Sequence, residues 1–316
     1  MTENCSSPNK GIFSATICAN KQIRQGFYRL KLKFSGAAAQ SFAKARPGQF
    51  AELDISGIAL PESKAIPEEL TDISERKILL RRPFSFCDVT SKDNKTTVEI
   101  LYCVVGPASL RMTTLSAGDS LNVIGPLGNG FSVTKNKKTA LFVAGGMGVG
   151  PLLYLAKIIT NDYPDTIVTA LVGAKTKEEL PFKGRLDEIA QQLGFSLPEF
   201  AMYSIESSVA TDDGSVGYKG FVTDFLAEWL GQNDLEPQDT IIYSCGPKAM
   251  LAKIADIAQE KKIDCQVCTE QMMACGIGLC QSCAVECKVS NSNETIYKLC
   301  CKDGPVFDSR EVIFRI

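Results

Sequence analysis

The sequence predicts a multidomain chain of the α/β and β classes, in which an antiparallel β-barrel precedes a doubly wound α/β domain and a small cysteine-rich domain. Short alternating segments fill residues 11–134, and apolar strands alternate with helices over residues 135–262. Cysteine and glycine are concentrated in residues 263–316. With 316 residues, 45% of them hydrophobic, the chain is long enough for more than one core.

The predicted barrel rests on a period of two in hydrophobicity. The runs that show it are "FSATICAN", "YRLKLKF", "GQFAELDI", "KILLRRPFSF", "TVEILYCVV" and "SLNVIGPLG". Breaks at Gly, Pro and Asn predict antiparallel strands, most economically closed as a small barrel. Residues 56–76 are polar and contain proline, which predicts a surface insertion, and the polar residues 1–10 are expected to form a tail.

The second region begins with "TALFVAGG", a continuous apolar run typical of a strand buried on both faces of a parallel sheet. A helical stretch, the strand "TIVTALVGA", more helix, the segment "FAMYSIES", the helix "FVTDFLAEWL", the strand "DTIIYSCGP" and a last helix follow. This alternation predicts the doubly wound domain. Residues 263–316 are too few for a conventional core, so a metal centre is expected to hold them together.

Composition excludes several classes of protein. A formal charge of −2 gives no electrostatic basis for binding nucleic acid or an anionic membrane. No apolar run reaches the ~18 residues of a membrane span, and the N-terminus lacks the layout of a secretion signal. We therefore expect a cytoplasmic protein with reduced thiols. The chain has no histidine, which excludes Ser-His-Asp and Cys-His catalysis and every His-ligated metal site.

Eight of the thirteen cysteines lie at or beyond residue 265. Cys275, Cys280 and Cys283 form C-x4-C-x2-C, and either Cys300 or Cys301 follows as a fourth candidate. This spacing is that of plant-type 2Fe-2S proteins, in which four thiolates hold two irons. The spacing alone does not separate Cys300 from Cys301.

Two glycines within the motif are consistent with a cluster, because Gly276 and Gly278 let the backbone approach and direct N–H groups at sulfur. A zinc site is the alternative, but zinc sites usually contain paired C-x2-C knuckles, and here the second is missing. Unligated thiols are the third possibility. Cys265, Cys268 and Cys287 are interpreted as structural thiols, with a second site at Cys265 and Cys268 only weakly indicated.

A flavin dinucleotide site is predicted at the end of one barrel strand. The strand-end motif is R-P-x-S, formed by Arg82, Pro83, Phe84 and Ser85. Gly106 and Ser109 then begin a short helix, whose free N–H groups suit a pyrophosphate. An arginine for phosphate charge and a hydroxyl for the flavin edge complete a coherent site, although Arg82 alone would be an ordinary strand-end residue.

A nucleotide site is predicted at the strand ends of the α/β domain. Glycines separate a buried strand from a helix at Gly145, Gly146, Gly148 and Gly150. A second turn, Cys245-Gly246-Pro247, ends another parallel strand, and ligands of open α/β sheets bind at that edge. Cys245 is expected as a contact beside a nicotinamide, not as a nucleophile; a purely structural turn is the alternative.

Taken in this order, the motifs resemble those of the ferredoxin–NADP reductase superfamily with a C-terminal 2Fe-2S domain. Within it, "CGIGLCQSC" and "YKLCCKDGPVFDSREV" are similar to the electron-transfer subunits of NAD-dependent dihydroorotate dehydrogenases. The resemblance covers almost the whole chain. It implies that Arg82 and Ser85 bind FAD with Gly106 and Ser109 at its phosphates, although many members have G-x-G-T where this chain has "GPAS".

The resemblance also bears on the fourth ligand, because in the family that cysteine precedes one residue and then D-G-P. Cys301, which precedes Lys302 and "DGP", matches this pattern. The implied metal ligands are therefore Cys275, Cys280, Cys283 and Cys301. Residues 56–76 and the long linker before Cys301 are departures from shorter members.

The implied function is an electron relay in pyrimidine (UMP) biosynthesis. Electrons would pass from the FMN of a separate dihydroorotate dehydrogenase catalytic subunit through the 2Fe-2S cluster and FAD to NAD⁺, within a heterotetramer. Substrate oxidation needs a base near the carbon, which we expect on the partner, so no residue of this chain is assigned a catalytic role. The alternative is the FAD/2Fe-2S small subunit of another soluble reductase: an NADH-dependent ferredoxin:NADP oxidoreductase, a sulfide dehydrogenase or an anaerobic sulfite reductase. A zinc-stabilised binding module is a different class.

Overall fold

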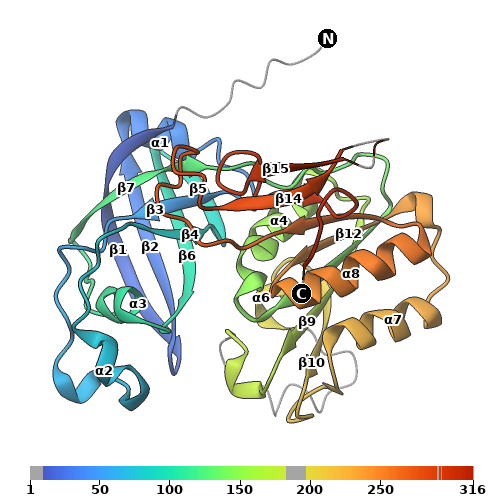
Figure 1. Cartoon of the computed structure of the whole chain (residues 1–316), viewed down its shortest axis with the longest axis horizontal. Helices are drawn as coiled ribbons and strands as arrows, with labels where there is room; N and C mark the ends of the chain where they lie inside the picture. The colour runs from blue at the N-terminus through green and yellow to red at the C-terminus, as the bar shows by residue number, and fades with distance from the viewer. Residues whose placement is uncertain (1–9, 183–196, 290–291, 293, 316) are drawn as a thin grey trace.

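The computed structural model describes residues 10–182, 197–289, 292 and 294–315. In this part of the chain two seven-stranded sheets stand side by side, and a two-stranded hairpin lies across one end of both (Figure 1). The first sheet comes from the N-terminal third, the second from the middle, and the hairpin from the cysteine-rich end.

The first sheet is antiparallel and curls into an open barrel. Its order is β4-β3-β7-β1-β2-β6-β5, without pairing between the edge strands β4 and β5. Alternation places Ala15, Ile17, Leu30 and Leu32 inside, each at most 1% exposed. The strands are β1 (Gly11–Arg24), β2 (Phe27–Ser35), β3 (Phe50–Leu53), β4 (Arg82–Ser85), β5 (Asp88–Lys92), β6 (Lys95–Cys103) and β7 (Ser120–Leu127).

The barrel differs from the predicted strands in three places. Helix α1 (Gly36–Phe42) follows β2 and buries Phe42 in the barrel core. The sequence does not predict strand β5, because four of its five residues, all except Val89, are polar. Only residues 82–85 of the predicted strand 77–86 are extended and paired, which leaves Leu79 and Leu80 exposed.

The inserted residues 56–76 form 3-10 turns and the short helix α2 (Thr71–Ser74). This segment packs beside helix α3 (Pro107–Met112), where the Arg111 guanidinium donates a 2.8 Å hydrogen bond to the Ser74 carbonyl. Leu70 is buried, so the insertion has a small apolar anchor of its own.

The second sheet has the order β11-β10-β9-β8-β12-β13-β16, and it is parallel except for β16. The chain runs from β8 outward to β10 and then returns to the other side of β8 with β12. The order therefore reverses between β8 and β12. The elements are β8 (Thr139–Gly145), α4 (Val149–Asp162), β9 (Ile167–Ala174), α6 (Pro198–Ala201), β10 (Glu206–Thr211), β11 (Tyr218–Lys219), α7 (Val222–Gln232), β12 (Thr240–Cys245) and α8 (Lys248–Lys261).

One predicted helix of this region lies outside the described residues, and one predicted segment is only partly extended. The helix expected after the second strand falls largely on residues 183–196, outside the described residues. The segment 200–207 is mostly not extended: β10 begins at Glu206, after the short helix α6. None of the described helices is long and apolar enough to cross a membrane.

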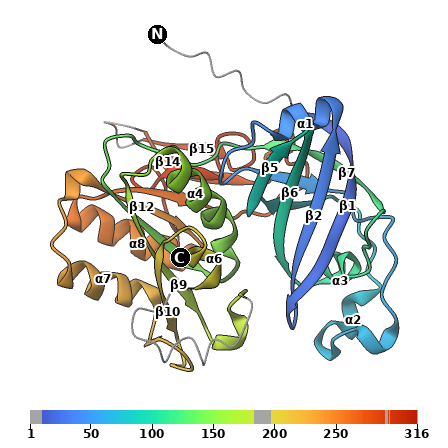
Figure 2. The ribbon, with the colours of Figure 1, turned by 180° about the vertical axis from the view of Figure 1, so that it is seen from behind.

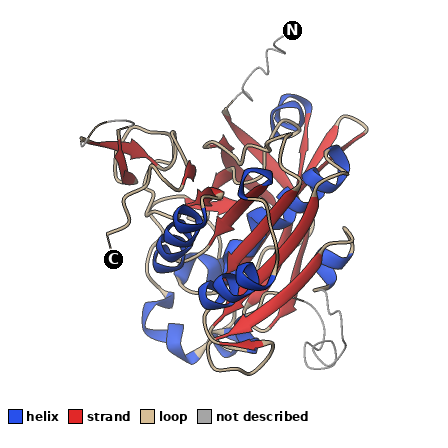
Figure 3. Cartoon of the chain, turned by 90° about the vertical axis from the view of Figure 1, so that its right-hand side faces the viewer, coloured by secondary structure: helices blue, strands red, loops and turns tan. Residues whose placement is uncertain are grey.

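The cysteine-rich end is built into the second sheet rather than attached beside it. Strand β13 (Asp264–Cys268) pairs with β12, and β16 (Val306–Asp308) pairs antiparallel with β13. Between them lie the cysteine motif and the hairpin of β14 (Ala284–Lys288) and β15 (Thr295–Leu299), which projects from the body (Figure 3). The sheet thus continues past the boundary predicted at residue 262.

Helix α4 joins the two sheets, as seen from behind in Figure 2. The Lys157 ammonium donates to Asp88 Oδ1 at 2.6 Å, the Val89 carbonyl at 2.8 Å and Thr90 Oγ1 at 2.7 Å. The Tyr154 hydroxyl donates a buried 2.7 Å hydrogen bond to the Ala45 carbonyl. Helix α4 of the α/β domain therefore binds the barrel through side-chain hydrogen bonds.

Replacing Lys157 with Met should lower the free energy of unfolding by about 1–3 kcal/mol, because the change leaves the half-buried Asp88 without its cation. Urea denaturation measures the effect. Lys138→Met is the matched control, since Lys138 pairs with Asp239 while 77% exposed and should matter much less. Equal losses in the two variants would contradict the docking role.

Candidate functional site

The four cysteines predicted as metal ligands lie in the structure as two pairs. The Cys280 N–H donates to Cys275 Sγ at 3.4 Å, and the Cys301 N–H donates to Cys283 Sγ at 3.4 Å. Hydrogen bonds from Ser282, followed by those from Cys275, lower the pKa of Cys280 to about 6. Cys283 and Cys301 are buried, whereas Cys280 is exposed. One pair thus lies at the surface and the other beneath it.

Cys300 and Cys301 point to different sides of the chain. Cys301 faces Cys283, while the Cys300 thiol donates to the Thr269 carbonyl at 3.6 Å and lies 3.6 Å from the Thr269 hydroxyl. Burial raises the pKa of Cys300 to about 12. In the structure Cys301 therefore pairs with Cys283, whereas Cys300 faces Thr269, and the choice of Cys301 as the fourth ligand stays a prediction.

Gly276 lets the loop of the first cysteine pair lie against the barrel, while Gly278 packs beside Lys302. Gly276 has a φ of +66°, which favours glycine, and a methyl group there would come within 2.5 Å of Glu52 Cγ and Oε1 on β3. Gly278 has a φ of +87°. The loop after Cys275 is therefore in direct contact with a barrel strand.

The second cysteine pair is tied to the barrel just after Cys301. The Asn129 side chain donates to the Lys302 and Asp303 carbonyls at 3.2 and 3.0 Å. The Asn129 N–H donates to the Gly304 carbonyl at 2.5 Å. Both halves of the cysteine site are thus held on the turn and strand of the first sheet.

The chemistry of the four thiols fits a centre with two metal ions, because two irons bridged by sulfide take four thiolates. Two thiol pairs, each with an N–H donor to sulfur, match the two irons and the N–H···S bonds of a 2Fe-2S cluster. The four cysteines fit that group.

Glu52 is a site residue that the sequence did not indicate. It is 0% exposed, and neither carboxyl oxygen has a hydrogen-bond partner among the described residues. Burial raises the pKa of this carboxyl to about 7, against the opposing effect of Arg82 and Arg81. A glutamate in an alternating strand resembles any solvent-facing residue, so only the loop that covers it reveals its position.

The remaining cysteines of this region lie outside the two pairs. Cys265 is buried in β13, and Cys287 is buried in the hairpin. Cys268 lies opposite Cys245 in the register of β13 and β12. Cys265 and Cys268 are three residues apart in β13, so their side chains lie on opposite faces of the sheet, and Cys245 is the thiol beside Cys268. These positions agree with structural thiols.

The predicted flavin motif forms the edge strand β4. Arg82, Pro83, Phe84 and Ser85 are all half-buried, as expected for a strand with no neighbour on one side. The Arg82 guanidinium donates to the Leu80 carbonyl at 2.9 Å and to that of Arg81 at 3.1 Å, and it has no carboxylate at ion-pair distance among the described residues. Its charge is therefore available to an anionic cofactor.

The second part of the flavin motif has a structural role in the turn after β6. Ser109 Oγ accepts hydrogen bonds from the Val105 N–H at 2.9 Å and the Gly106 N–H at 3.2 Å. Gly106 faces open space, since no atom lies within 4 Å of the position of a side chain, and Val105 is 75% exposed. The turn is open to a ligand, but the Ser109 hydroxyl is already engaged, so its contact with phosphate stays a prediction.

The two predicted nucleotide turns meet where the strand order of the parallel sheet reverses. Cys245 ends β12 opposite Ala144 of β8. A methyl group at Gly148 would come within 2.1 Å of the Cys245 carbonyl, so a side chain there would separate the turns. A methyl group at Gly145 would come within 2.7 Å of Pro247 Cδ, and Gly246 packs on Gly145. This edge is where open α/β sheets bind ligands.

The other two glycines of the motif differ from each other. Gly146 has a φ of +51° and open space in front of it, as a ligand contact requires. Gly150 lies inside α4, and a methyl group there would be 3.8 Å from Cys87 and 3.9 Å from Leu101. Gly150 therefore faces the barrel, and its prediction as a nucleotide contact is left without structural support.

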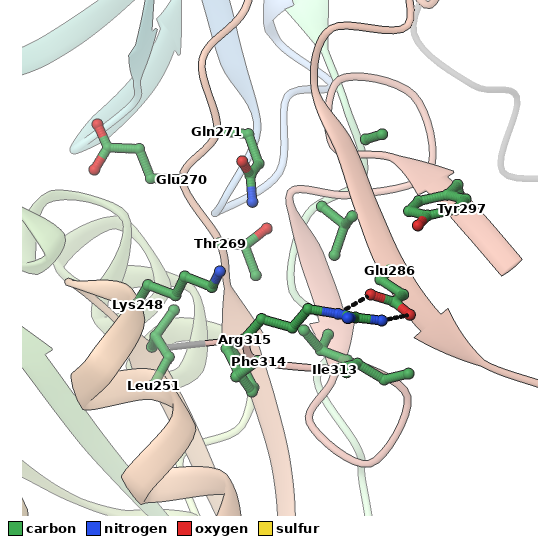
Figure 4. A pocket seen from close by; sticks show the side chains of 13 residues that line it. Lys248, Leu251, Thr269, Glu270, Gln271, Glu286, Tyr297, Ile313, Phe314 and Arg315 are labelled. Carbon is green, nitrogen blue, oxygen red and sulfur yellow. Dashed lines mark hydrogen bonds and ion pairs between the residues drawn. The ribbon is translucent and has the colours of Figure 1, made fainter. Parts of the chain in front are cut away.

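A cavity of about 230 Å³ lies apart from these sites, between α8 and the hairpin (Figure 4). Its polar lining includes Lys248 and Thr269 on one side and Tyr297 on the other. The Arg315 guanidinium pairs with the Glu286 carboxylate across it. None of the paired cysteines lines this cavity.

The raised pKa of Glu52 predicts how stability depends on pH. The folded protein retains a proton that the unfolded chain releases between the usual pKa of 4.5 and about 7. Stability should therefore fall as pH rises across this interval, by up to about 3 kcal/mol, and Glu52→Gln should abolish that fall. Urea denaturation at pH 5 and pH 8, at matched cofactor content, tests it; parallel losses in both proteins would contradict the prediction.

Two known protein families match separate parts of the chain, one at the cysteine-rich end and one in the α/β domain. The family described as "Iron-sulfur cluster binding domain of dihydroorotate dehydrogenase B" matches residues 270–313. The family described as "Oxidoreductase NAD-binding domain" matches residues 142–256. The first match includes all four paired cysteines, and the second includes both nucleotide turns.

Among solved structures, an NADH-dependent reduced ferredoxin-NADP oxidoreductase has a TM-score of 0.69 and 26% identity, covering 95% of this chain and 90% of that one. A ferredoxin NADP⁺ reductase from Neisseria gonorrhoeae has a TM-score of 0.53 and 18% identity, covering 79% and 91%. These neighbours confirm the predicted fold class, an antiparallel barrel followed by a nucleotide-binding α/β domain.

Two relatives are similar over almost their whole length. The protein from Caldanaerobacter subterraneus subsp. tengcongensis is 33% identical over 95% of this chain and 98% of its own. The protein from Geobacillus sp. is 34% identical over 94% and 97%. Both are named dihydroorotate dehydrogenase B (NAD(+)), electron transfer subunit. With its paired cysteines and two nucleotide turns, the chain belongs to the family of dihydroorotate dehydrogenase B electron transfer subunits.

Proposed function

We propose that this chain transfers electrons from a catalytic dihydroorotate dehydrogenase subunit to NAD⁺, as an oxidoreductase component of pyrimidine biosynthesis. The observation that carries the proposal is the contact of the cysteine loops with the barrel. Gly276 lies against β3, and β3 pairs with β4, which contains Arg82 and Ser85. Two cofactor sites are thereby built on neighbouring strands.

The residues of the chain hold the cofactors in fixed places. Cys275 and Cys280 would hold one iron, and Cys283 and Cys301 the other, while β4 and the turn at Gly106 would hold FAD. When bound, the cluster carries single electrons and FAD exchanges them for a hydride. The chain supplies no histidine, so its contribution is to bind and orient.

At the nucleotide site, the chain needs only to position NAD⁺. Gly146 faces open space at the reversal of strand order, and Gly148 lets Cys245-Gly246-Pro247 approach as the opposite wall. The hydride acceptor would bind there as NAD⁺. Removal of the substrate proton belongs to the FMN-containing partner.

An apolar patch around the exposed cysteine suits docking of that partner. Met272, Ile277 and Leu279 are 90%, 45% and 77% exposed, close in sequence to the exposed Cys280. Exposed apolar patches mark protein interfaces. We assign this patch to a catalytic subunit, because the relatives are named electron transfer subunits, and we infer a heterotetramer of the two.

We propose domains at residues 11–134, with an insertion at 56–76, at 135–262 and at 263–316, the last of which adds strands β13 and β16 to the sheet of the second. Of residues 1–10, predicted as a tail, all but Lys10 lie outside the described residues. We place the protein in the cytoplasm, where the free thiols of the described cysteines would stay reduced.

The choice of Cys301 as fourth ligand gives a sharp prediction. Cys301→Ser should lose most of the cluster iron and its visible absorbance, because a thiolate of the second pair is gone. Cys300→Ser, the adjacent buried cysteine, is the matched control and should keep both. Iron and acid-labile sulfide analysis measures the outcome, and the reverse result would exchange the two assignments.

The relay itself is tested in the reconstituted complex. Purified chain with flavin and 2Fe-2S absorbance, combined with a catalytic dihydroorotate dehydrogenase subunit, should reduce NAD⁺ when dihydroorotate is added. Either subunit alone is the control and should not. A cofactor-replete complex that fails this assay would favour the alternative reductase subunit, whose fold is shared by the ferredoxin-NADP oxidoreductase structure.

A further inference from the structure

The buried carboxyl of Glu52 has no structural explanation within the described chain. It is 0% exposed, and both of its oxygens lack hydrogen-bond partners there. A buried polar group without partners destabilises the folded state, and an apolar side chain of similar size would avoid that cost. Stability alone therefore gives no reason for a glutamate at this position.

The side chain points at the cluster loop. Ala51 and Leu53, on either side of it, belong to the barrel core, so Glu52 lies on the opposite face of β3. Phe50, two residues before, packs on that face with Cys283 and Cys301. Next to Glu52 the covering atoms are those of Gly276, the residue that follows Cys275.

The charged and titratable groups that face Glu52 come from two sides. Arg81 and Arg82 adjoin it from the start of β4, and Cys280 adjoins it from the cluster loop. Arg81 is already paired with Asp54 at 3.3 Å. The partner opposite Glu52 in the register is Pro83, which has no N–H to donate. Nothing in β4 therefore neutralises the carboxyl by a hydrogen bond.

We propose that Glu52 is a redox-tuning residue, whose buried carboxyl lowers the reduction potential of the cluster held by the adjacent loop. The proposal rests on the proposed function, because it needs iron at these thiols. A negative group close to a metal centre disfavours an added electron, and burial weakens the screening of that repulsion. A lower potential favours passage of the electron from the reduced cluster to FAD, so Glu52 gives the relay its direction.

The test is a redox titration of the holo complex at pH 9, followed by electron paramagnetic resonance of the reduced cluster and by flavin absorbance. Glu52→Gln keeps the shape and removes the charge. It should shift the reduction equilibrium of the cluster about tenfold toward the reduced form, which is ~59 mV for one electron, with FAD moving less. Asp54→Asn is the matched control, since Asp54 lies two residues on and binds Ser56 and Arg81 instead.

A second pair keeps the test decisive if Glu52→Gln loses the cluster. Glu52→Asp and Glu52→Asn have the same size and differ in charge, so only the aspartate should retain the low potential. Equal cluster potentials within the pair, an unshifted cluster in Glu52→Gln, or a shift confined to FAD would each overturn the proposal. A wild-type chain that binds no iron would instead contradict the proposed function. Failure of the redox-tuning proposal is therefore distinguishable from failure of the proposed function.

Discussion

The contact between the cysteine segment and the barrel determines the rest of this structure. Gly276 lies against Glu52 on β3, and Asn129 binds the backbone of residues 302–304. One attachment lies within the first thiol pair and the other just after the second, so the site is positioned by a sheet from much earlier in the chain. Without them the cysteines would form a local metal loop with no fixed relation to β4.

The same arrangement explains how one chain can serve two different ligands. Helix α4 begins at the nucleotide turn and also docks on β5 through Lys157. The barrel and the parallel sheet are therefore held together by a helix whose start lines the nucleotide edge. Strands β13 and β16 extend that sheet to the cysteine loops. The three sites are thus joined by side-chain hydrogen bonds between α4 and the barrel and by strand pairing within the second sheet.

Two motif residues have contacts within the chain that their motifs did not indicate. Ser109 Oγ accepts hydrogen bonds from its own turn, and Gly150 faces the barrel at ordinary van der Waals distance. The predicted cofactor contacts of both residues remain predictions, because small and hydroxyl-bearing residues suit both turns and ligand sites.

The sequence by itself determined the order of the domains, the barrel and parallel strands, and three of the cysteine positions, because alternation and short spacings are local properties. Spacing did not separate Cys300 from Cys301, which only the family resemblance distinguished, and no local pattern indicated Glu52. Only the tertiary structure decided how these side chains lie, because Cys301 lies beside Cys283 and Gly276 covers Glu52. Burial and facing are set by contacts between segments distant in sequence, which no local pattern contains.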